Sequence, residues 1–537
     1  MKVSVLFLAL LILLQVIPSL SNSQEYDVLV YGGTSAGIVA AIQVKKMGKS
    51  VLIVEPSNHL GGLTTGGLGA TDIGNKHVIG GISRDFYRAV YQEYLKAENW
   101  AHQQRSEYLT DESEDLTQWT FEPSVAQGIF KQWVADYKLE IVMNERLDLD
   151  HGVTMNNKEI TSITTQSGRT FSAKMFIDAT YEGDLMALSK VSYTFGREAN
   201  IVYNEDLNGI QTKYAIYHQF PDGVSPYKVE NDPQSGILPM VQAEIENDGI
   251  GDQRIQAYCF RMCLTNDESN MIPFEKPVDY DESEYELLFR AIKAGYDGPF
   301  FIMSKMPNYK TDSNNKGPFS SDYIGMNYQY PEGNYEEREA IIQQHETYQK
   351  GLMWTLANHS RVPINIKSKF KKWGLPKDEF TTNNHWPPQL YIRESRRMIG
   401  EFVMTEHHCT QDSISAALSI GMGAYTMDSH HMQRYINVNG DVKNEGDVEV
   451  GGFSPYPIGY KAIIPKKEEC GNLLVPVCLS SSHIAFGSIR MEPVFMILGQ
   501  SAATAACLAI DANVSVQNIE YQNLRKRLLK DHQVLEF

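Results

Sequence analysis

The side chains best suited to chemistry stand in one short segment near the end of the sequence. It contains His483, Arg490 and Glu492, and a long apolar segment follows it. A histidine titrates near neutral pH, so it can take a proton from a hydroxyl or an amine. An arginine can stabilise developing negative charge, whereas a glutamate can cap a helix as readily as it can catalyse. His483 and Arg490 are therefore candidate catalytic residues, with a structural role in the core as the alternative.

A second charged segment, residues 391–400 (YIRESRRMIG), sets arginines among apolar residues. Arg393 or Arg397 could reach an anionic group, and Arg393 is the third catalytic candidate. The alternative is a salt-bridged surface, which is common for such segments. The pairs His407–His408 and His430–His431 suggest a metal, but adjacent side chains point apart on any regular element. We predict that the sequence carries no metal site.

The elements that must position these residues begin with two short apolar runs in the first part of the chain. Residues 26–31 (YDVLVY) and 50–54 (SVLIV) are typical of buried parallel strands. Between them, residues 38–47 follow helical periodicity, and Gly48 is a natural helix stop. The turn before the helix and the end of the second strand supply these candidate cofactor contacts: Gly32, Gly33, Ser35, Ala36, Gly37 and Glu55.

This order of strand, glycine-rich turn, helix, strand and acid predicts a βαβ unit that binds a dinucleotide. Gly32 permits the tight turn, and Gly37 lets the helix pack closely on the strand. Free amides at the helix start attract a pyrophosphate, and Glu55 can accept hydrogen bonds from a ribose diol. The middle glycine of the usual fingerprint is replaced by Thr34, which would crowd the diphosphate unless Gly33 compensates.

A glycine-rich apolar loop, residues 59–69 (HLGGLTTGGLG), favours FAD over NAD, because it suits close passage of backbone along an extended cofactor. The order YGGTSAG, VLIVEP and GGLTTGG resembles the FAD-dependent oxidoreductases of glutathione-reductase-like fold. Within them it is similar to a secreted bacterial branch whose members are sometimes called xanthan lyases. The resemblance implies that FAD is also held by Gly61, Gly62, Leu63, Thr65, Val142, Ala179, Asp184, Gly487, Glu492 and Val494.

Later segments agree with this resemblance. Residues 122–137 predict an amphipathic helix and 139–143 a strand, whose backbone would meet the adenine in the family. Residues 160–165 and 170–177 predict a hairpin that leads into DATYEGD, where Tyr181 stands in the place of a usual glycine.

The last part of the chain carries the other strong signal. Residues 472–478 predict a strand, and Pro493 fits the first turn of a helix that reaches about residue 510. The resemblance implies that the start of this helix faces the pyrimidine side of the flavin, where its dipole stabilises the negative charge of the reduced ring.

The length of 537 residues exceeds one ordinary core. We expect an α/β fold in which a Rossmann-like FAD-binding domain carries an inserted α+β substrate domain. The FAD-binding domain would comprise residues 24–200 and 451–537, and the substrate or cap domain residues 201–450. Residues 1–23 would be a signal peptide.

The first residues predict export. Lys2 precedes an apolar run over residues 3–17, and Pro18 and small residues follow, with cleavage after Ser21 or Ser23. The run is shorter than the roughly 20 residues of a membrane span, and we expect no span after cleavage. The mature protein would be secreted or periplasmic.

The net charge of −18 argues against a nucleic-acid partner, because phosphates would be repelled. The six cysteines are too few for a disulfide scaffold, although Cys259 and Cys263 could pair or simply pack.

We therefore expect an exported FAD-dependent oxidoreductase that passes a hydride from a small-molecule or oligosaccharide substrate to flavin N5. A carbohydrate substrate rests on analogy of fold and on export. One alternative is a polysaccharide lyase or redox-neutral eliminase with bound FAD, in which Arg393 and His483 would act on a uronate. Another is a non-catalytic module that binds FAD or a glycan. The sequence leaves the oligomeric state open.

Overall fold

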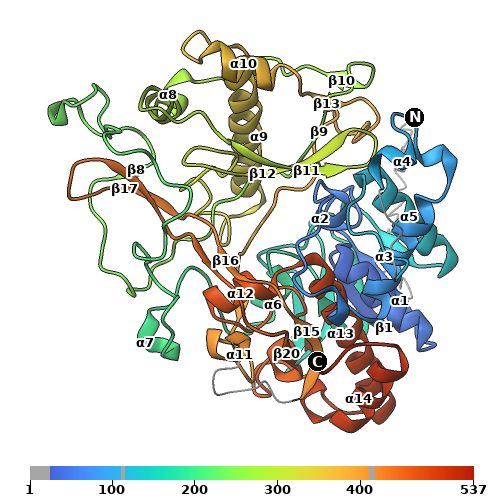
Figure 1. Cartoon of the computed structure of the whole chain (residues 1–537). Helices are drawn as coiled ribbons and strands as arrows, with labels where there is room; N and C mark the ends of the chain where they lie inside the picture. Colours follow the sequence, from blue (N-terminus) through green and yellow to red (C-terminus); the bar gives the residue numbers. More distant parts are fainter. Residues whose placement is uncertain (1–24, 110–114, 411–417) are drawn as a thin grey trace, which may run out of the picture.

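The computed structural model in Figure 1 describes residues 25–109, 115–410 and 418–537. The predicted signal peptide lies outside the described residues. A parallel sheet is formed by strands from the first part of the chain, with neighbours in the order β3 (Glu140–Val142), β2 (Val51–Val54), β1 (Glu25–Tyr31) and β6 (Thr170–Asp178). In this register Tyr31 lies opposite both Val54 and Asp178, so the carboxyl ends of three strands meet at one edge.

Strand β6 belongs to two pairings along its length. Its first residues pair antiparallel with β5 (Glu159–Thr164), which pairs in turn with β4 (Val153–Asn156). Its last residues pair parallel with β21 (Leu473–Leu474), which arrives from the end of the chain. The predicted hairpin and the Rossmann-like parallel sheet are therefore confirmed, whereas only two residues of the predicted strand 472–478 join the sheet.

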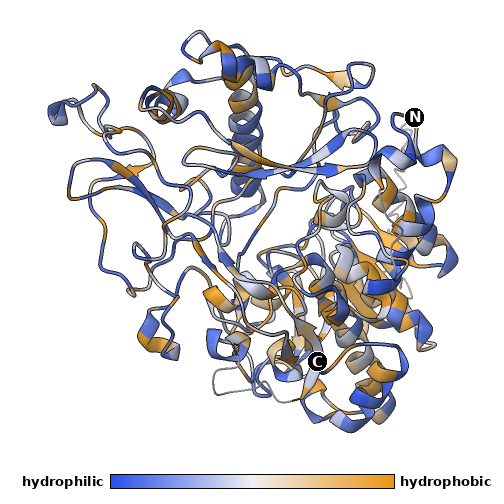
Figure 2. Cartoon of the chain, in the orientation of Figure 1, coloured by the Kyte–Doolittle hydropathy of each residue, from blue (hydrophilic) through white to orange (hydrophobic). Residues whose placement is uncertain are grey.

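The helices that cover this sheet include α1 (Ser35–Lys46) and α13 (Glu492–Ala512), which correspond to the helices predicted at residues 38–47 and from Pro493 to about residue 510. They pack so closely that a Cβ added at Gly499 would lie 2.3 Å from the carbonyl oxygen of Ala36. Around them lie α3 (Gly81–Glu93), α5 (Pro123–Asp136) and α14 (Tyr521–Lys530). Figure 2 shows hydrophobic residues concentrated around α1 and α13.

Helix α13 is an exception to the expectation that no later segment could span a membrane. Within the described residues it alone is long and apolar enough by composition, but 89% of its most apolar window is buried inside the protein. It is therefore the central helix of the core, and its hydropathy is explained by packing against α1 and α3.

The middle of the chain folds into a mixed set of helices and antiparallel strands. The long helix α9 (Tyr335–Asn358) lies beside α8 (Glu286–Lys293), α10 (Ile364–Phe370) and a sheet of β11 (Phe301–Met306), β12 (Lys310–Asn315) and β9 (Met262–Thr265). Small pairs of strands return toward the parallel sheet; among them β16 (Met427–Ser429) pairs with β19 (Val448–Val450). This composition agrees with the α+β character expected of residues 201–450.

The remaining elements are short. The helices are α2 (Gly62–Thr65), α4 (Arg105–Tyr108), α6 (Asp184–Leu188), α7 (Asn200–Tyr203), α11 (Glu406–Thr410) and α12 (His483–Ile489). The strands are β7 (Tyr193–Thr194), β8 (Val241–Gln242), β10 (Met271–Ile272), β13 (Leu375–Pro376), β14 (Arg397–Met398), β15 (Ser419–Gly423), β17 (Gln433–Ile436), β18 (Val442–Glu445) and β20 (Tyr456–Gly459).

All six cysteines lie in the described part of the chain, where each is buried and free. Cys259 and Cys263 therefore pack in the interior and do not pair.

Candidate functional site

The glycine-rich turn after β1 closes one end of a cavity of about 570 Å³. Gly32 has a φ of +98°, which L side chains rarely adopt, and α1 begins directly behind it. A Cβ at Gly37 would lie 2.0 Å from the carbonyl oxygen of Gly32, so a glycine is required for this packing. Both glycines thus have the roles that the sequence predicted for them.

Thr34 stands where the fingerprint has its middle glycine, and its contacts show why a threonine fits at this position. Its hydroxyl donates to the carbonyl oxygen of Ala179 at 2.7 Å and accepts from the amide of Gly37 at 3.3 Å. The side chain therefore caps α1 and joins it to the end of β6. The φ of Thr34 is −65°, so this position does not need a glycine. The hydroxyl is held by the protein on both sides, and the crowding that the sequence suggested is avoided.

Glu55, at the end of β2, lines the same cavity. One carboxylate oxygen accepts from the amide of Gly33 at 2.5 Å, and the other accepts from the amide of Ser57 at 2.7 Å. Burial raises the pKa of Glu55, and the hydrogen bonds from Ser57 and Gly33 oppose that rise. The acid is thus fixed against the glycine turn, where it can accept hydrogen bonds from a ribose.

Glu492, in the first turn of α13, joins three segments that are far apart in the sequence. Its carboxylate accepts from the hydroxyls of Ser35, Thr64 and Tyr181, each at 2.6 Å. The hydroxyl of Tyr181 also accepts from the amide of Leu63 at 2.9 Å. Burial raises the pKa of Glu492, and the hydroxyl donors lower it. The turn, the glycine loop, the end of β6 and the start of α13 therefore meet at one carboxylate.

Asp184 lies on another wall of the same cavity, at the start of α6. It binds Arg338 of α9 at 2.6 Å and Arg396 at 2.7 Å. Burial by itself raises the pKa of Asp184, but the two guanidinium groups outweigh burial and hold the pKa below its ordinary value. The charged segment 391–400 is therefore buried and ion-paired in the interior, not at a salt-bridged surface.

The other predicted cofactor residues divide into two groups. Gly61 and Gly62 have positive φ angles, and Gly62 lines the cavity close to the hydroxyl of Tyr181. Leu63 and Thr65 continue this turn in α2. The following residues do not line this cavity: Val142, Ala179, Gly487 and Val494. Gly487 instead packs against the backbone of Asp428, which lines another cavity.

A second cavity, of about 450 Å³, begins where the glycine loop ends. Gly62 lines the first cavity and Ala70 lines the second, so the loop between them connects the two. The second cavity is also lined by aromatic, acidic and basic side chains, among them Asp72, Trp119, Lys316, Tyr425, Asp428, His430 and Glu449.

Comparison with known proteins decides the family. The family model described as FAD dependent oxidoreductase matches residues 27–528. The chain belongs to this family. No curated protein matches the chain.

Solved structures match this FAD-dependent oxidoreductase only in part. The L-proline dehydrogenase from P. horikoshii is 17% identical, over 33% of this chain and 59% of that one, with a TM-score of 0.24. The L-amino acid deaminase from Proteus vulgaris is 16% identical, over 32% and 52%, with a TM-score of 0.24. OxyS anhydrotetracycline hydroxylase from Streptomyces rimosus is 12% identical, over 39% of each chain, with a TM-score of 0.25. The match thus spans less than two thirds of each of these proteins.

FAD is the cofactor of this oxidoreductase, and the residues of the first cavity fit it. A Cβ at Gly33 would lie 2.6 Å from Leu60 and 3.1 Å from a Glu55 oxygen, so a glycine is required where the turn passes the end of β2. Near the start of α13, Nε of Arg490 is buried without a hydrogen-bond partner among the described residues. Glu55 and the first-turn amides of α1 would hold the adenosine and diphosphate portions.

The three predicted catalytic residues of the oxidoreductase lie at different distances from the second cavity. Arg490 is the nearest: it donates to the carbonyl oxygen of Asp428, which lines the cavity, at 3.0 Å, and to the hydroxyl of Tyr391 at 2.5 Å. Arg393 donates to Oδ1 of Asn314, which lines the cavity, at 3.5 Å, and pairs with Asp322 at 2.9 Å. His483 lies behind both and lines neither cavity.

His483 is only 2% exposed, and its Nδ1 lies 2.7 Å from a Glu394 oxygen. Burial raises the pKa of Glu394, but His483, Arg397 and Gln256 together outweigh burial, so the pKa lies below its ordinary value. Gln256 connects this pair to Arg490, since its amide donates to Glu394 at 3.1 Å and its oxygen accepts from Arg490 at 3.3 Å. His483 is thus linked to Arg490 through the interior.

Two histidines, His218 and His430, line the second cavity, and the sequence suggested His430 only as a metal ligand. Nδ1 of His430 lies 2.7 Å from Asp322, and its Nε2 lies 3.9 Å from Asp428. Burial raises the pKa of Asp322, but Arg393 and His430 lower it well below the ordinary value. The ionised Asp322 therefore holds a proton on Nδ1 and leaves Nε2 free to act as a base. No sequence signal marked this pair, whose members are 108 positions apart.

Proposed function

We propose that this chain is an exported FAD-dependent oxidoreductase that oxidises a small hydroxyl-rich substrate, a carbohydrate or a fragment of one, in the second cavity. The observation that carries the proposal is the His430–Asp322 pair on the wall of a polar cavity at the far end of the glycine loop. The aromatic rings of Trp119 and Tyr425 in that wall suit the apolar face of a sugar ring, and the surrounding polar groups suit its hydroxyls. Export is supported by the signal-peptide pattern of residues 1–23.

The chain's own residues would handle the proton of the reaction. His430 Nε2 takes the proton of the substrate hydroxyl, while Asp322 stabilises the imidazolium through Nδ1–H. Arg393 keeps Asp322 ionised and in place at 2.9 Å, so it acts as a positioning residue. Arg490 holds the backbone of Asp428 and shapes the cavity wall. FAD, when bound, supplies the acceptor for the hydride.

The same geometry disfavours the two residues that the sequence suggested for the lyase alternative. Elimination from a uronate needs a base and a free positive charge to neutralise the carboxylate. Arg393 is already paired with Asp322 and His483 with Glu394, and both side chains are buried. The residues proposed for that chemistry are therefore engaged elsewhere. A non-catalytic module would not need an oriented histidine in the cavity.

Anaerobic incubation of the FAD-loaded protein with a panel of neutral sugars and polyols tests the reaction. We expect one class of substrate to bleach the visible absorbance of the flavin. His430→Gln should slow this bleaching by about 10²–10⁴-fold with unchanged FAD content, because a general base contributes about that much. His151→Gln is the matched control, since His151 lies at an exposed turn.

An unsaturated sugar formed while the flavin stays oxidised would refute oxidation in favour of elimination. Bleaching at the wild-type rate in His430→Gln would refute the assignment of the base. Export is tested separately by mass spectrometry of the mature N-terminus, which should begin at Asn22 or Gln24. A mature protein that retains residues 1–21 would contradict it.

A further inference from the structure

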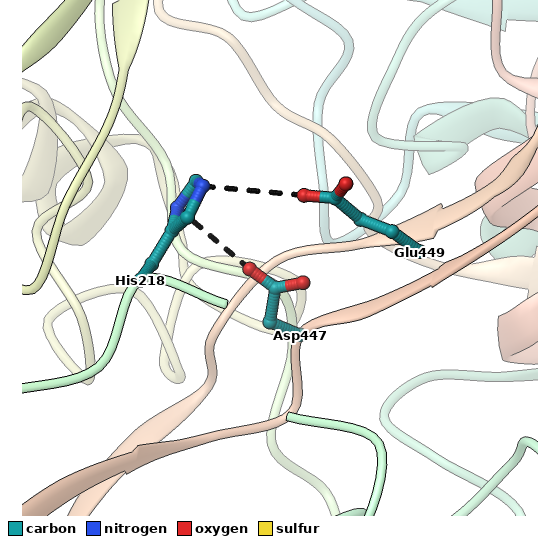
Figure 3. A group of neighbouring side chains, drawn as sticks. All are labelled: His218, Asp447 and Glu449. Carbon is teal, nitrogen blue, oxygen red and sulfur yellow. Dashed lines mark ion pairs between the residues drawn. The ribbon is translucent and has the colours of Figure 1, made fainter. Parts of the chain in front are cut away.

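Three potential metal ligands converge on the wall of the second cavity. His218 comes from the loop between α7 and β8, and Asp447 and Glu449 stand at alternate positions at the start of β19. Figure 3 shows the three side chains pointing toward one another. His218 Nδ1 lies 3.8 Å from Asp447 Oδ2, and His218 Nε2 lies 4.0 Å from Glu449 Oε1. One ligand atom from each residue lies within 4.8 Å of the others.

Asp447 gives a second, independent sign of a bound cation. The residue is 3% exposed, and its Oδ1 is buried without a hydrogen-bond partner among the described residues. The carboxylates of Asp428 and Glu449 line the same cavity as Asp447, so like charges surround the buried side chain. A buried carboxyl among like charges is costly unless a cation or hydrogen-bond donors compensate it.

The neighbouring bases do not supply that compensation in full. His431 Nε2 lies 3.6 Å from Asp447 Oδ2, beyond hydrogen-bond distance. Lys316 is a competing cation, with Nζ 3.2 Å from His218 Nε2. The ammonium of Lys316 donates to Nε2 of His218, the ring nitrogen that faces Glu449.

We propose that His218, Asp447 and Glu449 bind one divalent metal cation in the wall of the second cavity. One imidazole and two carboxylates suit Mn²⁺ or Zn²⁺, since neutral imidazole is a good ligand for transition metals and carboxylate oxygen for Mn²⁺. Bonds of about 2.0–2.2 Å around one ion need only small movements of ligand atoms that already lie this close. The metal displaces the ammonium of Lys316 from His218.

Three protein ligands leave coordination positions open, as in catalytic metal sites. These positions face the cavity that the residues line, so the cation can take a hydroxyl oxygen of a bound substrate. This use of the metal rests on the proposed function, whereas the binding site itself does not. Metal binding is therefore measured without substrate, and its outcome is separate from that of the flavin assay.

The test is titration of the FAD-loaded full chain with MnCl₂, followed by electron paramagnetic resonance of the free ion, and with ZnCl₂ by calorimetry. We expect one site per chain. Asp447→Asn and His218→Gln should each weaken binding at least about 10–100-fold, the cost seen for loss of supporting groups around a metal. Asp222→Asn is the matched control, because that carboxylate pairs with Lys443 at the surface and is 90% exposed.

Two further variants keep the test decisive if the buried substitutions do not fold, which thermal unfolding would reveal. Glu449→Gln changes a carboxylate that is 41% exposed and should also weaken binding. Lys316→Met removes the competing ammonium and should strengthen it. The proposal is overturned if the wild type binds neither ion stoichiometrically. It is equally overturned if Glu449→Gln and Asp447→Asn bind as tightly as Asp222→Asn.

Discussion

Replacing Gly37 by alanine should break the cofactor turn while leaving most of the molecule intact. The added Cβ would lie 2.0 Å from the carbonyl oxygen of Gly32, where real Cβ contacts essentially never fall below 3.0 Å. The turn and α1 must therefore separate by about 1 Å, and overpacking of this kind costs about 1–3 kcal/mol. The separation moves the first-turn amides away from Glu55. We expect FAD affinity to fall at least about tenfold, which corresponds to about 1.4 kcal/mol.

Gly128→Ala provides the matched control, because Gly128 lies inside α5 and an added Cβ there would meet nothing within 4 Å. That variant should gain about 0.5–1 kcal/mol from helix propensity and keep its FAD. The measurements are urea unfolding and the ratio of released flavin to protein. A Gly37→Ala protein with wild-type unfolding and one FAD per chain would refute the packing argument.

Three other substitutions test separate parts of the site. Thr34→Ala removes the cap of α1 and should lower the free energy of unfolding by about 1–2 kcal/mol in urea titrations. Tyr181→Phe removes the donor to Glu492 and should cost about 1.5–3 kcal/mol by the same measurement, because the partner is a buried carboxylate. Burial raises the pKa of Asp178 from 3.8 to about 6, so its contribution to stability is full below pH 4 and is lost as the pH rises through 6. The loss of stability from pH 4 to pH 7 should therefore be about 2 kcal/mol smaller in Asp178→Asn than in the wild type, and equal slopes would contradict this.

The FAD-binding elements could be predicted because their signals are local. Alternating and continuous apolar runs predict β1, β2 and the β5–β6 hairpin, and glycines at fixed positions predict the turn. The strand expected at residues 472–478 was wrong in length for a tertiary reason. After Leu474 the backbone turns to bond elsewhere, with the amide of Val475 donating to Ile463 at 2.9 Å. The hydropathy of residues 472–478 alone cannot identify Ile463 as the backbone partner of Val475.

The candidate catalytic residues depend on pairings that the sequence does not contain. Arg393 and Arg396 look like surface charges in a linear reading, yet each meets a buried aspartate from another part of the chain. The sequence does not single out His430 as a functional residue, because the side chains of two adjacent histidines point apart and rarely bind one metal. The same rule holds here, since His430 pairs with Asp322 while His431 lies beside Asp447. The sequence pattern does not show which carboxylate lies beside each imidazole ring, Asp322 beside His430 and Asp447 beside His431.

The position of Glu492 explains why the cofactor site needs the end of the chain. Its carboxylate receives hydroxyls from the turn of α1, from α2 and from the end of β6, and no two of these segments are neighbours in sequence. Without α13, the hydroxyl of Tyr181 would lose its acceptor, and the loop that joins the two cavities would lose a fixed point. A buried carboxylate left without its donors is also unfavourable, so the docking of α13 and the ordering of the turn and the loop stabilise each other. Docking of the last long helix and assembly of the FAD site are therefore one cooperative step.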